Sequence, residues 1–146
     1  EQIWYEQLAL AEKYQKVVVV HCRKAMHLLF RDAKLLKKLP AVVLHSFQGS
    51  PLEAHSILGK GINAYFSCGK QILNNNKHAI KCVSTIDLER LLLETDAPYQ
   101  TLYGENSTNL TDISGVYVKA STIRNMALVP FSESIKENFI KCFQAP

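Results

Sequence analysis

The most regular feature of the chain is a series of short apolar runs separated by sequence with helical spacing. Three runs lack polar alternation, at residues 17–21, 42–45 and 91–94, and a further strand is predicted over residues 62–66, running to Gly69. Continuous runs of Val, Ile and Leu are typical of strands that are buried on both faces of a parallel sheet. The pattern therefore predicts four buried strands.

Apolar residues recur at three- and four-residue intervals between the predicted strands, as on the buried stripe of a helix. Two helix boundaries have clear signals: Pro40 follows one helical segment, and Gly49-Ser50-Pro51 opens the next. Pro130 is predicted to separate the last two helices. Helices are predicted over residues 3–15, 24–38, 51–58, 71–85 (after a loop), 116–127 and 132–143.

Helices and strands alternate strictly in this reading, which favours parallel strands joined by right-handed crossovers. Four strands suffice for an open sheet or for half of a (β/α)₈ barrel, which needs about 250 residues when complete. The polar stretch over residues 100–114 is interpreted as a functional or mobile loop.

Residues that can bind a metal stand at the ends of the predicted strands. His21 and His45 each end an apolar run, and Glu94 and Asp96 end another. The carboxyl ends of parallel strands meet at one edge, and imidazole and carboxylate groups suit Zn²⁺, Mn²⁺, Fe²⁺ or Mg²⁺. For either histidine alone, a hydrogen-bonded residue near the core is the better interpretation, but the four equivalent positions together favour a metal site.

Arg23 is equally consistent with binding an anionic substrate and with a salt bridge.

Length, charge and cysteine content indicate which class of protein this is. The 146 residues fit one domain, and a net charge of +4 is compatible with a polyanionic substrate without being a strong nucleic-acid signature. Four cysteines without CxxC spacing are predicted to be free thiols in a reducing compartment, and no apolar run approaches the ~18 residues of a membrane span. We therefore expect a cytoplasmic protein. Dinucleotide, P-loop and serine-hydrolase motifs are absent from the sequence.

Three segments resemble the signature segments of the TatD-type metal-dependent deoxyribonucleases, which are TIM barrels of the amidohydrolase superfamily. They are His-Cys-Arg at residues 21–23, His-Ser-Phe-Gln-Gly-Ser at 45–50 and Leu-Leu-Glu-Thr-Asp-Ala-Pro-Tyr at 92–99. The resemblance covers nearly the whole chain. It implies an α/β fold of the TIM-barrel type that is partial, with about strands five to eight. Residues 1–146 would be a single TatD-like domain in which the N-terminal half of the barrel is absent.

The resemblance also implies a site and an activity. His21, His45 and Asp96 fall on metal-ligand positions, Glu94 and Asp96 on catalytic acids, and Arg23 on a substrate-binding position. The implied cofactor is a divalent cation, Mg²⁺ first with Mn²⁺ or Zn²⁺ as alternatives, and two cations in an intact site. The implied reaction is cleavage of phosphodiester bonds in DNA at single-stranded or nicked ends. The family's His-x-His pair and its Glu on strand four have no counterpart here, so we expect impaired activity of this chain alone.

Two alternatives remain open at this stage. A related amidohydrolase-type deacylase would use the same metal chemistry on an acyl substrate. A non-catalytic half-barrel would instead self-associate through its open barrel edges.

Overall fold

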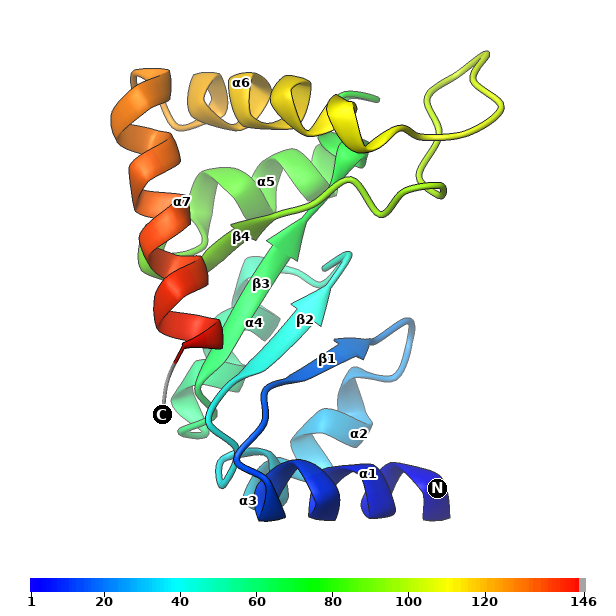
Figure 1. Cartoon of the computed structure of the whole chain (residues 1–146), viewed down its shortest axis with the longest axis vertical. Helices are drawn as coiled ribbons and strands as arrows, with labels where there is room; N and C mark the ends of the chain where they lie inside the picture. The colour runs from blue at the N-terminus through cyan, green and yellow to red at the C-terminus, as the bar shows by residue number, and fades with distance from the viewer. Residues whose placement is uncertain (145–146) are drawn as a thin grey trace.

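Four parallel strands form the sheet of the structure, a computed structural model in which residues 1–144 are described (Figure 1). The strands are β1 (Val18–His21), β2 (Val42–His45), β3 (Ala64–Cys68) and β4 (Leu91–Leu93), and they lie side by side in chain order. The register places His21 directly beside His45 at the ends of β1 and β2. Consecutive parallel strands in this order are those of a partial barrel, which confirms the predicted fold class.

Helices precede the first strand, connect the strands and continue after β4. They are α1 (Gln2–Lys13), α2 (Met26–Arg31), α3 (Ala33–Leu36), α4 (Pro51–Gly59), α5 (Lys77–Thr85), α6 (Ile113–Ile123) and α7 (Leu128–Phe143), with short 3-10 turns η1 (Lys70–Ile72), η2 (Leu88–Arg90) and η3 (Leu110–Asp112). In Figure 1, α4 and α5 lie behind the sheet. None of the helices in residues 1–144 is long and apolar enough to cross a membrane.

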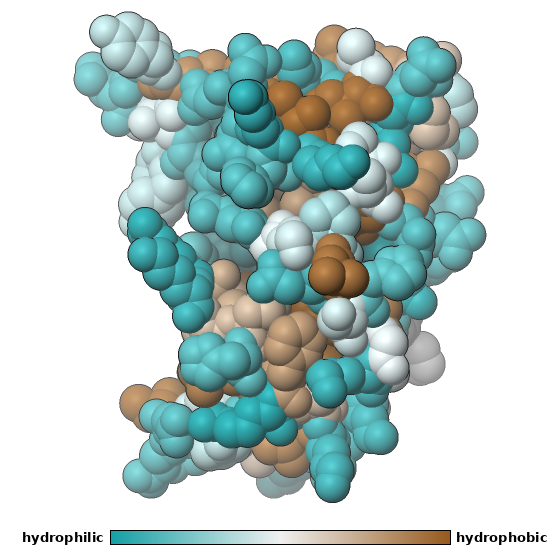
Figure 2. Space-filling model, turned by 180° about the vertical axis from the view of Figure 1, so that it is seen from behind, coloured by the Kyte–Doolittle hydropathy of each residue, from teal (hydrophilic) through white to brown (hydrophobic). Residues whose placement is uncertain are grey.

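The two faces of the sheet have different surroundings. On the face covered by helices, Leu44 and Phe66 are fully buried in the main hydrophobic core. The view from that side is mostly hydrophilic, with hydrophobic residues in separate patches (Figure 2). On the opposite face, Val19 is 58% exposed, and a cavity there is lined by Val43 of β2 and Phe139 of α7 among others. The face that would line the inside of a barrel is therefore partly open.

The helix predicted over residues 24–38 is two helices, because the chain turns at Asp32. This residue ends α2 and precedes α3, and it is only 6% exposed. Its carboxylate accepts hydrogen bonds from the Trp4 indole (3.0 Å) and from Arg31 (2.9 Å). The single-helix prediction is wrong because apolar periodicity does not reveal that Asp32 is anchored to α1.

The chain after β4 also differs from the prediction. The last two helices are separated at residues 124–127, and Pro130 lies inside the first turn of α7, where a missing backbone N–H breaks no intrahelical hydrogen bond. The helix before it begins at Ile113, so the irregular segment is shorter at its C-terminal end than predicted. Asn138 of α7 is buried and donates hydrogen bonds to the carbonyls of Leu88 (2.6 Å) and Leu91 (2.9 Å), which fixes α7 against η2 and β4.

Candidate metal centre

The imidazole of His45, at the end of β2, lies between two carboxylates that follow β4. Its Nδ1 is 2.9 Å from Oε1 of Glu94, and its Nε2 is 3.6 Å from Oδ1 of Asp96. One ligand atom from each of the three residues lies within 4.8 Å of the other two. All three side chains are half-buried. One imidazole nitrogen and two carboxylate oxygens fit a divalent cation and leave coordination positions for water or substrate, as catalytic metal sites do.

The backbone turns sharply at both places that supply these groups. Ser46, directly after His45, has φ +48°, and Asp96 has φ +59°. Side chains other than glycine rarely adopt this left-handed conformation, although Asp tolerates it better than most. Ser46 also donates its backbone N–H to Oε1 of Glu94 at 2.9 Å. These turns bring groups on β2 and β4 together, although β3 lies between the two strands in the sheet.

Gln100 completes the contacts around the two carboxylates. Its Nε2 donates to Oδ2 of Asp96 at 3.1 Å and to Oγ of Ser46 at 2.9 Å. The sequence offered no signal for Gln100, which is one polar residue in a long polar stretch. Ser46 lies inside the segment that carries the family resemblance, but its residue type alone did not mark it as part of a site.

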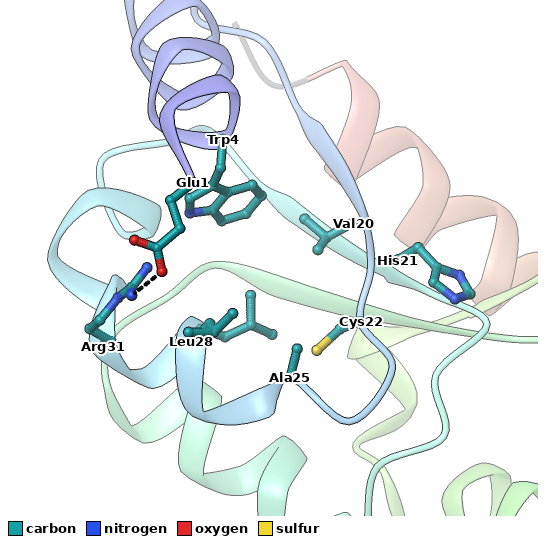
Figure 3. Close-up of a pocket in the computed structure, with 9 residues that line it drawn as sticks. Glu1, Trp4, Val20, His21, Cys22, Ala25, Leu28 and Arg31 are labelled. Atoms are coloured by element: carbon teal, nitrogen blue, oxygen red, sulfur yellow. Dashed lines mark hydrogen bonds and ion pairs between the residues drawn. The ribbon is translucent and has the colours of Figure 1, made fainter.

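His21 lies beside this group but is not part of it. Its ring centroid is 5.3 Å from that of His45, and its side chain is exposed. His21 also borders the cavity that Trp4, Cys22 and Leu28 line, but Figure 3 shows its ring turned away from these side chains. His21 therefore lies at the expected edge of the sheet and on its inner face. It is next to the group formed by His45, Glu94 and Asp96.

Arg23 follows β1 at the same edge of the sheet. It is exposed and lines a cleft together with Lys24, Gln48 and Glu53, which come from the segments after β1 and β2. Within residues 1–144 Arg23 makes no ion pair, so its guanidinium is accessible to an anionic ligand.

A buried lysine holds the segment after β4 in place. Lys70, at the start of η1, is 1% exposed. Its Nζ lies 2.5 Å from Oε2 of Glu105 and 2.6 Å from Oδ2 of Asp112 and also contacts Thr108. Burial alone would lower the pKa of Lys70, but hydrogen bonds to Asp112 and Glu105 outweigh it and raise that pKa. The same hydrogen bonds lower the pKa of Glu105 and of Asp112.

This cluster predicts a specific loss of stability in acid. A carboxyl whose pKa is lowered in the folded chain contributes stability above its ordinary pKa, here 4.5 for Glu105 and 3.8 for Asp112, and loses it as pH falls through the lowered value. We expect the free energy of unfolding, measured with urea, to fall as the pH is lowered from about 5 through and below the ordinary pKa values of these two carboxyls. Lys70→Met should flatten this dependence, whereas Glu137→Gln, which alters an exposed pair with Lys141, should leave it unchanged. Equal pH slopes for wild type and Lys70→Met would contradict the prediction.

The sequence of this chain is similar to that of known metal-dependent hydrolases. The family model described as TatD-related DNase matches residues 1–144. A Mycoplasma pneumoniae protein named as an uncharacterized metal-dependent hydrolase is 35% identical over 103 residues, which are 68% of this chain and 40% of that protein. A Cronobacter sakazakii protein named 3'-5' ssDNA/RNA exonuclease TatD is 36% identical over 103 residues, 68% of this chain and 38% of that protein.

Solved structures show the same arrangement of elements. The TatD homologue YJJV from Escherichia coli K12 superposes with a TM-score of 0.86 at 26% identity, over 99% of this chain and 57% of its own. A TatD-family hydrolase from Entamoeba histolytica has the same fold, with a TM-score of 0.78 at 20% identity over 98% of this chain and 56% of its own. The chain therefore spans about 40% of the curated relatives described above and little more than half of these solved structures.

Proposed function

This chain belongs to the TatD-related DNase family, whose members are metal-dependent hydrolases, and we propose that it forms part of the active site of a nuclease that cleaves phosphodiester bonds in DNA. The observation that carries the proposal is the convergence of His45, Glu94 and Asp96 at the carboxyl edge of the sheet. In α/β folds with parallel strands, this edge is where active sites lie.

The residues of the chain have separable roles in this proposal. His45 and Asp96 would hold a divalent cation, with Mg²⁺ as the native ion. His21, at the same edge of the sheet, would supply a further ligand. When bound, the cation polarises a phosphoryl oxygen and lowers the pKa of a bound water. Asp96 would act as the proton acceptor in hydrolysis, and Glu94, whose Oε1 accepts a hydrogen bond from the Ser46 N–H, would be the second catalytic carboxylate.

The substrate side of the proposal rests on Arg23 and its surroundings. A guanidinium without an ionic partner, next to the exposed Lys24 in a cleft at the site edge, suits a DNA phosphate. The Cronobacter relative is named as an exonuclease of single-stranded DNA and RNA, which supports a single-stranded or nicked DNA end as substrate here. Four cysteines that form no disulfide support a cytoplasmic location.

The open inner face of the sheet bears on how active this chain is by itself. Val19 is largely exposed there, and β1 and β4 are the outer strands of the sheet. We propose that full activity needs the complementary strands of a barrel, supplied by another polypeptide segment. Self-association through the outer strands is the second candidate, and it is favoured by the same exposed face.

A nuclease assay tests the proposal. The chain is incubated with Mg²⁺ or Mn²⁺ and an end-labelled single-stranded oligonucleotide, alone and joined to the N-terminal barrel half of a TatD relative. We expect little cleavage by the chain alone and cation-dependent cleavage by the joined protein, which EDTA removes. His45→Ala in the joined protein should remove cleavage as well.

Three other outcomes would count against the proposal. Robust cleavage by the chain alone would show that the essential ligands are misidentified. Hydrolysis of an acyl substrate in place of DNA would identify a deacylase. Sedimentation as a stable dimer that neither binds a cation nor cleaves DNA would support the self-associating half-barrel.

A further inference from the structure

The carboxamide of Gln100 connects the two turns that form the candidate metal centre. Gln100 lies 54 residues after Ser46 and four residues after Asp96, and its Nε2 reaches both. Ser46 in turn donates its backbone N–H to Glu94. One amide group therefore links both carboxylates of the site, one directly and one through Ser46.

The chemistry of these contacts fixes which atom of the carboxamide faces Asp96. An ionised carboxylate only accepts hydrogen bonds, so the NH₂ group of Gln100 must point toward it. The contact occupies Oδ2 of Asp96, which leaves Oδ1 as the oxygen nearest to Nε2 of His45. The hydrogen bond from Gln100 therefore supports the orientation in which Oδ1 of Asp96 faces His45.

The fold makes room for this side chain at Gly69. A Cβ atom built at Gly69 would overlap Oε1 of Gln100 and lie 2.9 Å from both Cδ and Nε2. Gly69 has φ −111°, a conformation that any residue adopts, so the backbone does not require glycine at this position. The absent side chain is needed for space, and the atoms that use the space belong to Gln100.

Two further features of Gln100 have an energetic cost. Its Oε1 is buried and has no hydrogen-bond partner within residues 1–144, and leaving a buried acceptor unpaired is unfavourable. Its backbone has φ +56°, in the left-handed region. Both features are consistent with a side chain that is held in place for the contacts of its NH₂ group.

We infer that Gln100 is a positioning residue of the candidate metal centre, which orients Asp96 for cation binding and depends on the space at Gly69. The inference rests on the proposed function, because it takes the group of His45, Glu94 and Asp96 as the metal centre. Metal ligands are commonly oriented by hydrogen bonds from residues behind them, and loss of such a partner lowers metal affinity about 10–100-fold.

The test measures the affinity of the full chain for Mn²⁺, by calorimetry and by the electron paramagnetic resonance signal of free Mn²⁺. Gln100→Ala is expected to weaken Mn²⁺ binding about tenfold or more. Gln71→Ala is the matched control, because Gln71 is a half-buried glutamine whose side chain forms no hydrogen bond within residues 1–144. Its affinity should stay within about twofold of the wild type.

A second variant separates positioning from a general disturbance of the fold. Gly69→Ala should weaken Mn²⁺ binding in the wild-type chain, because the added methyl group displaces the Gln100 carboxamide. In the Gln100→Ala background the same change has nothing to displace, so it should have little further effect. A merely destabilising substitution would lower affinity in both backgrounds.

Each result bears on the inference. Wild-type affinity in Gln100→Ala, or an equal loss from Gly69→Ala in both backgrounds, overturns the positioning role and leaves the metal centre intact. A wild-type chain that binds no Mn²⁺ overturns the metal centre and, with it, the inference. Tenfold weaker binding in both single variants, without further loss in the double variant, supports it.

Discussion

Replacing Asp96 with Asn is expected to lower the affinity of this chain for Mn²⁺ by more than about a hundredfold, beyond the effect of losing a supporting contact. Three changes combine in this variant. The neutral amide removes one of the two negative charges that the site offers to a cation. The amide also presents an NH₂ group that can face His45, and its contact with the NH₂ group of Gln100 can no longer be charge-assisted.

The matched control is Asp87→Asn. Asp87 is exposed, precedes η2 and makes no side-chain cap hydrogen bond, so the same change of charge there should leave Mn²⁺ affinity within about twofold. Calorimetric titration of both variants and wild type under one ionic strength separates loss of a ligand from loss of overall charge. If Asp96→Asn bound Mn²⁺ as tightly as Asp87→Asn, the carboxylate at position 96 would not be a ligand.

The arrangement of the strands followed directly from the sequence. Each of the runs at residues 17–21, 42–45 and 91–94 is β-branched or leucine-rich and ends at a polar residue, and each forms a parallel strand within one residue of the expected end. Burial on both faces explains the lack of alternation in β2, whereas β1 is exposed on one face at Val19 although its sequence is equally apolar. The position of the candidate site at the strand ends was therefore predictable as well.

The composition of the site was less predictable, because it depends on turns that follow the strands. Glu94 and Asp96 were predicted to stand at the end of a strand, but β4 ends at Leu93 and Asp96 has a left-handed backbone. Both carboxylates still reach His45, on opposite nitrogens of its ring. Strand periodicity could not show that Glu94 contacts His45 directly, whereas His21 only lies beside it.

The contacts that hold the site together were beyond prediction from local patterns. Lys70 contacts residues 35 and 42 positions later, and Gln100 contacts Ser46 across 54 positions. A buried lysine and a half-buried glutamine have no periodic or motif signature, because their partners are determined only when the chain folds. Long-range polar contacts of this kind also explain why the helix predicted over residues 24–38 is interrupted at Asp32.

Phe66→Ala is expected to destabilise the fold by about 3–5 kcal/mol, because it removes a large side chain from the centre of the sheet. Phe66 lies on β3 and is fully buried. Its backbone is paired with Leu44 on one side and Leu91 on the other. Its ring packs edge-on against Phe47, with 4.8 Å between centroids, so the substitution loses this contact and leaves a cavity. Urea unfolding of the variant and wild type gives the difference directly.

Phe139→Ala is the matched control for this prediction, because the same atoms are removed from a side chain that is 53% exposed. Phe139 contacts Phe143 on α7, with ring centroids 4.8 Å apart, on the open face of the sheet. Removing it exposes little new surface and leaves no enclosed cavity, so the expected loss is below about 1 kcal/mol. Equal losses in the two variants would show that the helix-covered face does not carry the main core, and that the open face is packed as tightly as the buried one.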